Sequence, residues 1–305
     1  MKETLHFVKA STRYKREHKS DYGKERIEIL YEDKDIVVIN KSSGLLSVPY
    51  PGSKSRTAIE ILEKIMRKKG TFSESHRPFV VHRLDRDTSG VMMFALNERV
   101  QKKIMSSWKT MVTDRLYRAV AENPRRNHPE LPDSGLIDEP LAKNACHQGY
   151  VPKKLDDNAE TCEARTNFRV VLRGRTHTLF ELSLDTGKKN QIRAHLASRH
   201  YPLAGDENYR ARTDPFHRLA LHARTLAFIH PVTGEKMSFE IPEPEEWDLY
   251  VKKGDLHPQT PVWANERKER IQYNAQIENI KTPDHSLRRQ ARKMDFIARG
   301  KSGIK

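Results

Sequence analysis

The sequence is poor in cysteine, with only Cys146 and Cys162 among its 305 residues. Two cysteines cannot form the disulfide framework of a small secreted domain, and they cannot supply a cysteine-based zinc site. Long apolar runs are also missing, because no stretch approaches the roughly 20 apolar residues that a membrane-spanning helix needs. The first residues, which include Lys2, Glu3 and Lys9, lack the apolar centre of a signal peptide. We therefore expect a soluble, cytoplasmic protein without a membrane association.

Acidic residues are outnumbered by basic ones, since 41 Asp and Glu face 56 Lys and Arg, for a formal net charge of +15. A charge of this sign favours partners that are polyanions, and nucleic acid is the first candidate. Composition by itself is weak evidence, because solvated Lys-rich surfaces are common and an anionic membrane surface would be attracted in the same way. The functional argument therefore rests on short motifs.

Residues 79–96 combine two apolar, strand-like runs with a short turn between them that is rich in Arg and Asp. Such a layout presents a carboxylate from a rigid sheet into a cleft. The alternative is that Asp85 and Asp87 are turn residues that pair with the neighbouring arginines. A protein-kinase catalytic loop also starts with His-Arg, but it continues directly with Asp and needs a Gly-rich phosphate loop, which does not precede this segment.

The order of residues in this segment favours the first interpretation. His82-Arg83-Leu84-Asp85, followed by Thr88-Ser89-Gly90, resembles the catalytic segment of the RluA-type pseudouridine synthases, which isomerise uridine to pseudouridine in RNA. The resemblance implies that Asp85 is the catalytic aspartate. It also implies a reaction without a metal or a nucleotide cofactor, because the glycosidic bond is cut at N1 and remade at C5 with no net change in composition.

A second resemblance lies in Arg115-Leu116-Tyr117-Arg118-Ala119, which is similar to the family segment Lys-x-Tyr-x-Ala. Tyr117 matches the tyrosine that lies against the target base. An aromatic ring in that position stacks on an extruded uracil, and base–aromatic stacking contributes roughly 1–3 kcal/mol. Arg115 stands where the family usually has Lys, which keeps the charge but changes the geometry.

A third segment, residues 186–195, is similar to the family motif Thr-Gly-Arg-x-His-Gln-Ile-Arg-x-His. Arg193 matches the arginine that pairs with the catalytic aspartate, and a guanidinium there would keep Asp85 ionised in a desolvated cleft. Lys188 and Asn190 depart from the motif, and we interpret both departures as affecting how the RNA backbone is held rather than the reaction. The matched segments imply these substrate contacts: His82, Arg83, Leu84, Arg86, Thr88, Arg115, Lys188, Asn190, Gln191, Ile192, His195 and Leu221.

The resemblance covers residues 27–244 and implies an α+β fold, in which a mixed, mainly antiparallel central sheet is surrounded by helices and carries a central catalytic cleft. Residues on either side differ in composition. Those from 1 to 26 predict a basic N-terminal arm, and those from 245 to 305 predict a basic, partly helical C-terminal extension. Residues 123–160 are rich in proline, and we expect them to form loops.

Local patterns inside the domain predict its first elements. Apolar runs on either side of residues 32–35 predict a tight hairpin. Thr57 begins a capping box, which predicts a helix that ends at Gly70. Asn97 is expected to cap a second helix, whose Met105 and Trp108 face the core.

The predicted function is isomerisation of specific uridines in ribosomal or transfer RNA, by a monomer without an obligatory protein partner. Whether Asp85 acts as nucleophile or as base stays open. The alternative is a non-catalytic RNA-binding protein on the same fold, which would require a broken catalytic set. A metal-dependent hydrolase that uses Asp85 with His82, His177, His195 and His222 is disfavoured, since these histidines lack a compact ligand spacing.

Overall fold

The computed structural model of the protein describes residues 27–50, 52, 55–125, 127–145, 147–152 and 160–253. The predicted basic arm lies outside the described residues, and so does the part of the predicted extension that follows Lys253. In the described ranges no helix has the length and apolar content needed to cross a bilayer.

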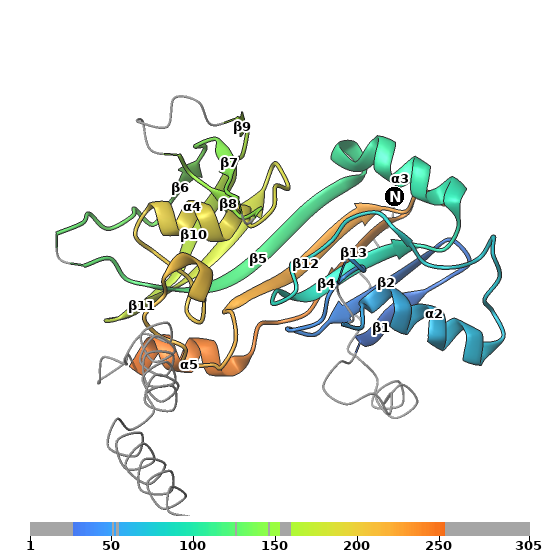
Figure 1. Ribbon diagram of the computed structural model, residues 1–305, viewed down its shortest axis with the longest axis horizontal. Helices are drawn as coiled ribbons and strands as arrows, with labels where there is room; N and C mark the ends of the chain where they lie inside the picture. Colours follow the sequence, from blue (N-terminus) through green and yellow to red (C-terminus); the bar gives the residue numbers. More distant parts are fainter. Residues whose placement is uncertain are drawn as a thin grey trace, which may run out of the picture. The chain divides into compact units, whose positions relative to one another are not determined.

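A ten-stranded sheet organises the domain (Figure 1), in the order β1-β2-β4-β12-β5-β11-β10-β6, with β13 paired to β12 and β3 paired to β4. Its pairings are antiparallel except that between β4 and β12. The predicted mixed, mainly antiparallel sheet is confirmed. Its strands are β1 (Ile27–Glu32), β2 (Ile36–Lys41), β3 (Phe79–Val80), β4 (Ser89–Ala95), β5 (Val112–Glu122), β6 (Ser134–Ile137), β10 (Thr166–Arg173), β11 (His177–Leu184), β12 (Leu221–Ile229) and β13 (Lys236–Glu240).

Two helices cover opposite faces of the β1–β2–β4 end of the sheet. Alternate residues of β2 point to opposite sides, so the strand offers an apolar face to each helix. Val37 and Ile39 share a buried cluster with α2 (Ala58–Lys69), and Ile36 and Val38 share another with α3 (Glu98–Met111). The predicted limits of the first helix are confirmed: Thr57 forms the capping box, and Gly70 ends the helix with φ 72°.

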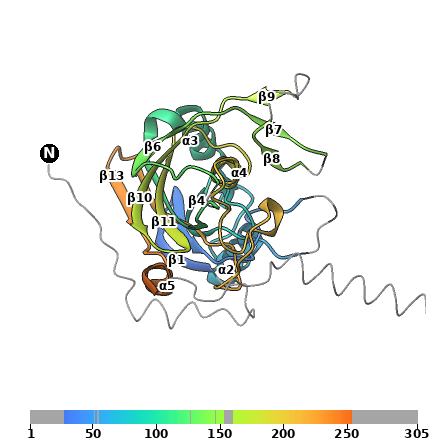
Figure 2. The same ribbon diagram turned by 90° about the vertical axis from the view of Figure 1, so that its left-hand side faces the viewer.

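The other end of the sheet is covered in the same way by α4 (Gln191–Ser198) and α5 (Glu245–Lys253), which lie on opposite faces of β10 and β11 (Figure 2). Trp247 of α5 is fully buried against β5 and β11. Residues of the predicted C-terminal extension therefore belong to the packed domain, which reaches at least to Lys253.

The prediction of loops for residues 123–160 is wrong in part. Strand β6 pairs with β10 and forms one edge of the main sheet. A separate three-stranded sheet is built from β7 (Leu141–Lys143), β8 (Gly149–Tyr150) and β9 (Thr161–Cys162). These strands are two to four residues long, which is too short for an alternating pattern to stand out among the prolines.

The parallel contact between β4 and β12 requires a glycine at its closest point. Gly90 has φ 114°, and a Cβ atom on it would lie 2.1 Å from the carbonyl oxygen of Ala223. No other residue type fits this approach without moving one of the strands. The glycine of the Thr-Ser-Gly motif thus brings the Asp85 loop against β12.

Candidate active site

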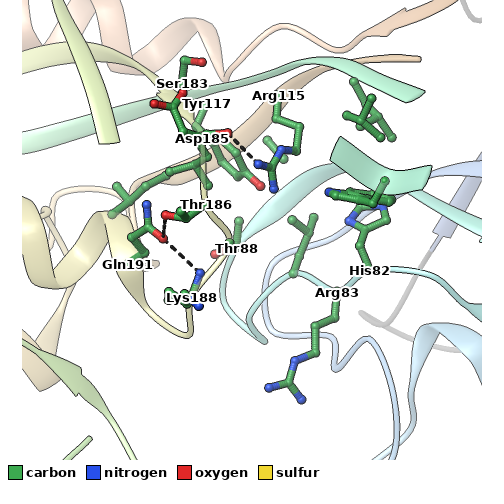
Figure 3. Close-up of a pocket in the computed structure, with 18 of the residues that line it drawn as sticks. His82, Arg83, Thr88, Arg115, Tyr117, Ser183, Asp185, Thr186, Lys188 and Gln191 are labelled. Carbon is green, nitrogen blue, oxygen red and sulfur yellow. Dashed lines mark hydrogen bonds between the residues drawn. The ribbon is translucent and has the colours of Figure 1, made fainter. Parts of the chain in front are cut away.

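A cleft of about 940 Å³ opens between the Asp85 loop on one side and residues 185–193 on the other. In Figure 3, His82 and Arg83 lie on one side of this space and Lys188 and Gln191 on the other. Most of the predicted site residues are brought together here. Those that line the cleft are His82, Arg83, Leu84, Asp85, Thr88, Arg115, Tyr117, Lys188, Asn190, Gln191, Ile192, Arg193 and Leu221.

The Asp85 loop is held in place by the loop that follows β2. Ser47 Oγ donates to the carbonyl oxygen of Leu84 at 2.7 Å and accepts the backbone N–H of the same residue at 3.1 Å. Ser43 Oγ donates to the carbonyl oxygen of Asp87 at 2.7 Å. These bonds end on backbone atoms, so they fix the path of the loop and leave the side chain of Asp85 available to the cleft.

Lys41 ties the same two loops together from inside the protein. Its side chain is fully buried, and its Nζ donates to the carbonyl oxygens of Ser42, Leu45 and Arg86 at 2.9, 2.6 and 2.9 Å. Burial lowers the pKa of Lys41 to about 7, although the charges of Asp87 and Asp85 oppose that shift. Lys41 is therefore a structural anchor under the Asp85 loop.

Asp85 meets two groups from the opposite side of the cleft. Its Oδ2 accepts a hydrogen bond from Asn190 Nδ2 at 2.7 Å and lies 3.7 Å from Arg193 Nη1. The predicted pair of Asp85 and Arg193 is present, but the shorter contact comes from Asn190. This corrects our interpretation that Asn190 affects only how RNA is held. Its backbone is left-handed, with φ 57°, a conformation that Asn adopts more easily than most residues.

Arg193 is positioned by a residue that the sequence did not reveal as part of the site. Its Nε and Nη2 donate to the two carboxylate oxygens of Asp206, each at 2.7 Å, and its guanidinium carbon lies 5.1 Å from the ring centre of Tyr209. Burial works to lower the pKa of Arg193, but the hydrogen bonds and charge of Asp206 outweigh it and raise that pKa. In the sequence, Gly205-Asp206 reads as a turn beside the cleft, and in the structure it precedes the short helix η1 (Glu207–Tyr209).

Tyr117 lies on the floor of the cleft, where β5 passes between β12 and β11. Burial raises the pKa of its phenol, as the charge of Asp85 does to a smaller extent, while Arg115 opposes the shift. The ring is therefore a neutral phenol at pH 7. Arg115 donates from Nη2 to the carbonyl oxygen of Leu184 at 2.5 Å, which bridges β5 to β11.

His82 faces the cleft as a neutral imidazole. Its Nε2 accepts the backbone N–H of Met93 at 3.0 Å, and its ring lies 5.0 Å from that of Trp108. Burial, with a smaller contribution from Arg115, lowers its pKa to about 3. The sequence placed Met105 and Trp108 toward the core. Trp108 does pack against the core cluster around α3 and also lines the cleft. For Met105 the prediction is wrong, because its side chain is 59% exposed at the cleft.

Gln191 shapes the loop rather than reaching for a ligand. Its Oε1 accepts from Thr186 Oγ1 at 2.8 Å and from the N–H of Lys188 at 3.0 Å, and its Nε2 donates to Arg165 and Thr166. These bonds present Lys188 at the mouth of the cleft, where its side chain is exposed.

Two predicted substrate contacts lie away from the cleft. His195 is fully buried, and its ring nitrogens lie 2.9 Å from Thr166 Oγ1 and 3.0 Å from the carbonyl oxygen of Glu139, so the prediction that it touches substrate is wrong. Arg86 does not line the cleft, and it donates from Nε and Nη2 to the carboxylate of Asp87.

Among the described residues, one group of three potential metal ligands comes close together: Asp33, Asp35 and His230. The Nδ1 atom of His230 accepts the backbone N–H groups of Val232 and Thr233, so the hydrogen of its ring is on Nε2, 3.0 Å from Asp33. A nitrogen that carries a hydrogen does not coordinate a metal. This group stabilises the β1–β2 hairpin.

Comparison with known proteins gives concordant results. A family profile described as RNA pseudouridylate synthase matches residues 35–198. An uncharacterized RNA pseudouridine synthase of Bacillus subtilis, YlyB, is 35% identical over 221 residues, which are 72% of this chain and 70% of the relative. The protein named ribosomal large subunit pseudouridine synthase D of Pseudomonas aeruginosa is 32% identical over 245 residues, which are 75% of this chain and 72% of that one.

Among solved structures, the human protein called RNA pseudouridylate synthase domain containing 1 aligns with a TM-score of 0.57. The alignment covers 76% of this chain and 92% of the human chain at 21% sequence identity. At this identity the similarity concerns the fold.

Proposed function

This chain belongs to the RNA pseudouridylate synthase family, and from that premise we propose that it converts specific uridines of structured RNA to pseudouridine with Asp85 as the catalytic carboxylate. The observation that carries the proposal is the contact of Asp85 with Asn190 and Arg193 inside the cleft. An amide and a guanidinium approach the same carboxylate oxygen, and together they fix the direction of the side chain.

The reaction needs a group that helps to break the bond between N1 of the base and the ribose, after which a bond forms from the ribose to C5. C5 loses its proton to a base and N1 gains one, so the net composition is unchanged. The oriented carboxylate of Asp85 acts either as the nucleophile or as the base that promotes a glycal-like intermediate. Arg193 is held by two hydrogen bonds to Asp206, and a guanidinium does not give up its proton near pH 7, so Arg193 positions Asp85 and takes no part in proton transfer.

Tyr117 has the position and the chemistry to hold the target base. Its ring lies on the cleft floor and is a neutral phenol, so it stacks on an uncharged uracil without introducing a charge of its own. Its elevated pKa makes the phenol a weak acid. We therefore assign Tyr117 to stacking first, and to deprotonation at C5 only when it has lost its own proton.

Of the two candidate substrates, we propose ribosomal RNA rather than transfer RNA. The support comes from relatives with about one third identity, which are named ribosomal large subunit pseudouridine synthase D. A uridine inside a duplex has to be extruded, at a cost of a few kcal/mol, and the basic surface of the protein offsets that cost through phosphate contacts. Mapping of pseudouridines in total RNA from cells with and without the protein identifies the RNA and the position.

Replacing the carboxylate tests the proposal directly. We expect Asp85→Asn to lower pseudouridine formation by at least about 10³-fold, because an amide is neither a nucleophile nor a base, while the affinity for RNA stays within threefold. Asp87→Asn is the matched control, since Asp87 is two residues away and pairs with Arg86 outside the cleft. Turnover by Asp85→Asn at the wild-type rate would remove Asp85 from the reaction.

A further inference from the structure

The cleft continues past Asp85 and Tyr117 to the last turns of α3, and the proposed reaction leaves that part unused. Its lining there comes from Met105, Trp108 and Lys109 of α3 and from residues 112–115 of β5. One nucleotide at Asp85 does not fill a cleft of about 940 Å³, and an RNA substrate brings neighbours on both sides of its target.

Strand β5 connects the two parts of the cleft. Side chains two residues apart on a strand share a face and are about 6.6 Å apart, so Thr113, Arg115 and Tyr117 form a row along the floor. All three line the cleft. In Figure 3, Arg115 lies between Tyr117 and His82. The row thus leads from the proposed position of the target base toward the helix that carries Trp108.

Trp108 has the surroundings of a stacking platform. It is half-buried, with His82 packed at 5.0 Å and the guanidinium carbon of Arg115 at 5.9 Å from its ring centre. Met105, one turn earlier on α3, leaves 59% of its surface to the solvent at the edge of the cleft. An aromatic ring and a polarisable thioether in a solvent-open cleft are suited to the face of a nucleobase.

The charges at this end also suit a nucleotide. Lys109 is exposed on the last turn of α3, and Arg115 lies on the strand below it. Asp114 is a carboxylate that lines this part of the cleft, so the two cations outnumber it. Phosphate groups on either side of a stacked base would find both cations within the same stretch of cleft.

We propose that Trp108 and Met105 form a subsite that stacks the base of a nucleotide flanking the target uridine, with Lys109 and Arg115 facing the adjacent phosphates. The inference rests on the proposed function, because it takes RNA as the occupant of the cleft. It goes further, because it predicts that the affinity of the protein for RNA depends on a base beside the target uridine.

The test is a binding cycle with two RNA probes: a five-nucleotide oligouridylate and the same chain with abasic residues on both sides of the central uridine. We expect the wild-type protein to bind the intact probe about tenfold more tightly than the abasic one. Trp108→Ala should lose this preference, and Trp108→Phe should retain most of it. If Trp108→Ala keeps the full preference, the subsite is not at Trp108.

A second pair of variants covers the case in which Trp108→Ala does not fold. Lys109 lines the cleft and Lys103 is exposed on the same helix outside it, so Lys109→Ala should weaken binding of the intact probe and lower its salt dependence by about one charge, whereas Lys103→Ala should not. Equal behaviour of the two variants overturns the assignment of Lys109 to the RNA path.

The binding cycle needs no turnover, which separates this inference from the proposed function. If the wild-type protein shows the base-dependent preference but forms no pseudouridine, the subsite stands and the proposed reaction fails. If it forms pseudouridine but binds both probes equally, the reaction stands and the subsite fails. With a converted RNA, the KM of Trp108→Ala should rise about tenfold while kcat changes less than threefold, because the ring does not touch the reacting atoms.

Discussion

The two groups that meet in the cleft are held differently: buried side chains hold backbone atoms of the Asp85 loop, whereas the Arg193 side chain is itself held by another side chain. Lys41 and Ser47 bond to main-chain groups of the Asp85 loop. Across the cleft, Arg193 depends on the carboxylate of Asp206. The first arrangement tolerates changes in the loop's own side chains. In the second, Arg193 loses its position when its partner Asp206 is changed.

This contrast suits what each side has to do. The Asp85 loop must keep one carboxylate at a fixed point while its neighbours contact RNA, and backbone anchors leave those neighbours free. The Arg193 side must keep a cation buried beside a reacting carboxylate, and only a second carboxylate offsets the cost of that burial. Breaking each arrangement should therefore give effects of different size.

The largest effect is expected from Asp206→Ala, which leaves the guanidinium of Arg193 buried without its main partner. Removal of one member of a buried ion pair costs about 3–5 kcal/mol in the free energy of unfolding, and urea denaturation measures it. Asp185→Ala is the control, because Asp185 is 48% exposed in its pair with Arg165 and should cost under about 1 kcal/mol. A loss for Asp206→Ala as small as that of the control would show that the two sides do not differ in this way.

A smaller effect is expected on the opposite side from Ser47→Ala. The change leaves the N–H and carbonyl of Leu84 without the buried hydroxyl that serves both, and an unsatisfied buried polar group costs about 1–3 kcal/mol. The variant should still bind RNA, with a lower kcat because the Asp85 loop is less well fixed. Ser106→Ala, at an exposed position of α3, should be neutral in both measurements, and equal results for the two variants would remove Ser47 as an anchor.

The contrast also explains which parts of the site could be read from the sequence. Asp85, Tyr117 and Arg193 lie in short motifs with a fixed order, and the fold and the family followed from those motifs. The partners that hold them lie outside these three motifs. Lys41 reads equally well as an exposed strand end or as the lysine of a further family-like segment, and Asp206 reads as part of a turn beside the cleft. Neither reading names a hydrogen-bond partner, since a hydrogen bond between residues far apart in the chain leaves no local pattern.

The sequence-based predictions that were wrong on α3, at His195 and at β6 share one cause, because each depends on contacts that only the folded chain makes. Helical periodicity groups Met105 and Trp108 with buried Ile104. It does not show that Met105 is exposed at the cleft, or that Trp108 lines the cleft as well as packing against the core. His195 fits the family motif, yet its neighbours Thr166 and Glu139 engage both ring nitrogens. Strand β6 is four residues long and finds its partner in β10, which no local signal indicates.

The pH dependence of stability offers a third test, centred on His82 of the Asp85 loop. Its folded pKa of about 3 lies below the ordinary value of 6.5, so the unfolded chain binds the proton first and the native state loses stability as the pH falls below 6.5. Between pH 6.5 and 5 the loss should be on the order of 2 kcal/mol.

His82→Gln removes the titrating group, so the unfolding free energies of wild type and variant should converge as the pH falls over this range. Parallel curves would mean that the imidazole already carries a proton in the folded protein. The bond from the N–H of Met93 to Nε2 would then have to be absent at low pH, which proton-sensitive NMR shifts of the ring would reveal.

The smallest effect is expected from Asn190→Gly, which breaks the hydrogen bond from Asn190 Nδ2 to Asp85 across the cleft. Glycine accepts the left-handed backbone of residue 190 without strain, so stability should change little, while Asn190→Ala should lose about 1 kcal/mol to that conformation. The kcat for pseudouridine formation should fall about tenfold in both, since Asp85 loses a charge-assisted hydrogen bond but keeps Arg193. Asn190→His, which installs the residue of the family motif, should recover most of the rate. Wild-type turnover by Asn190→Gly would mean that Arg193 alone orients Asp85, and the side with side-chain pairs would then contribute a single group to the reaction.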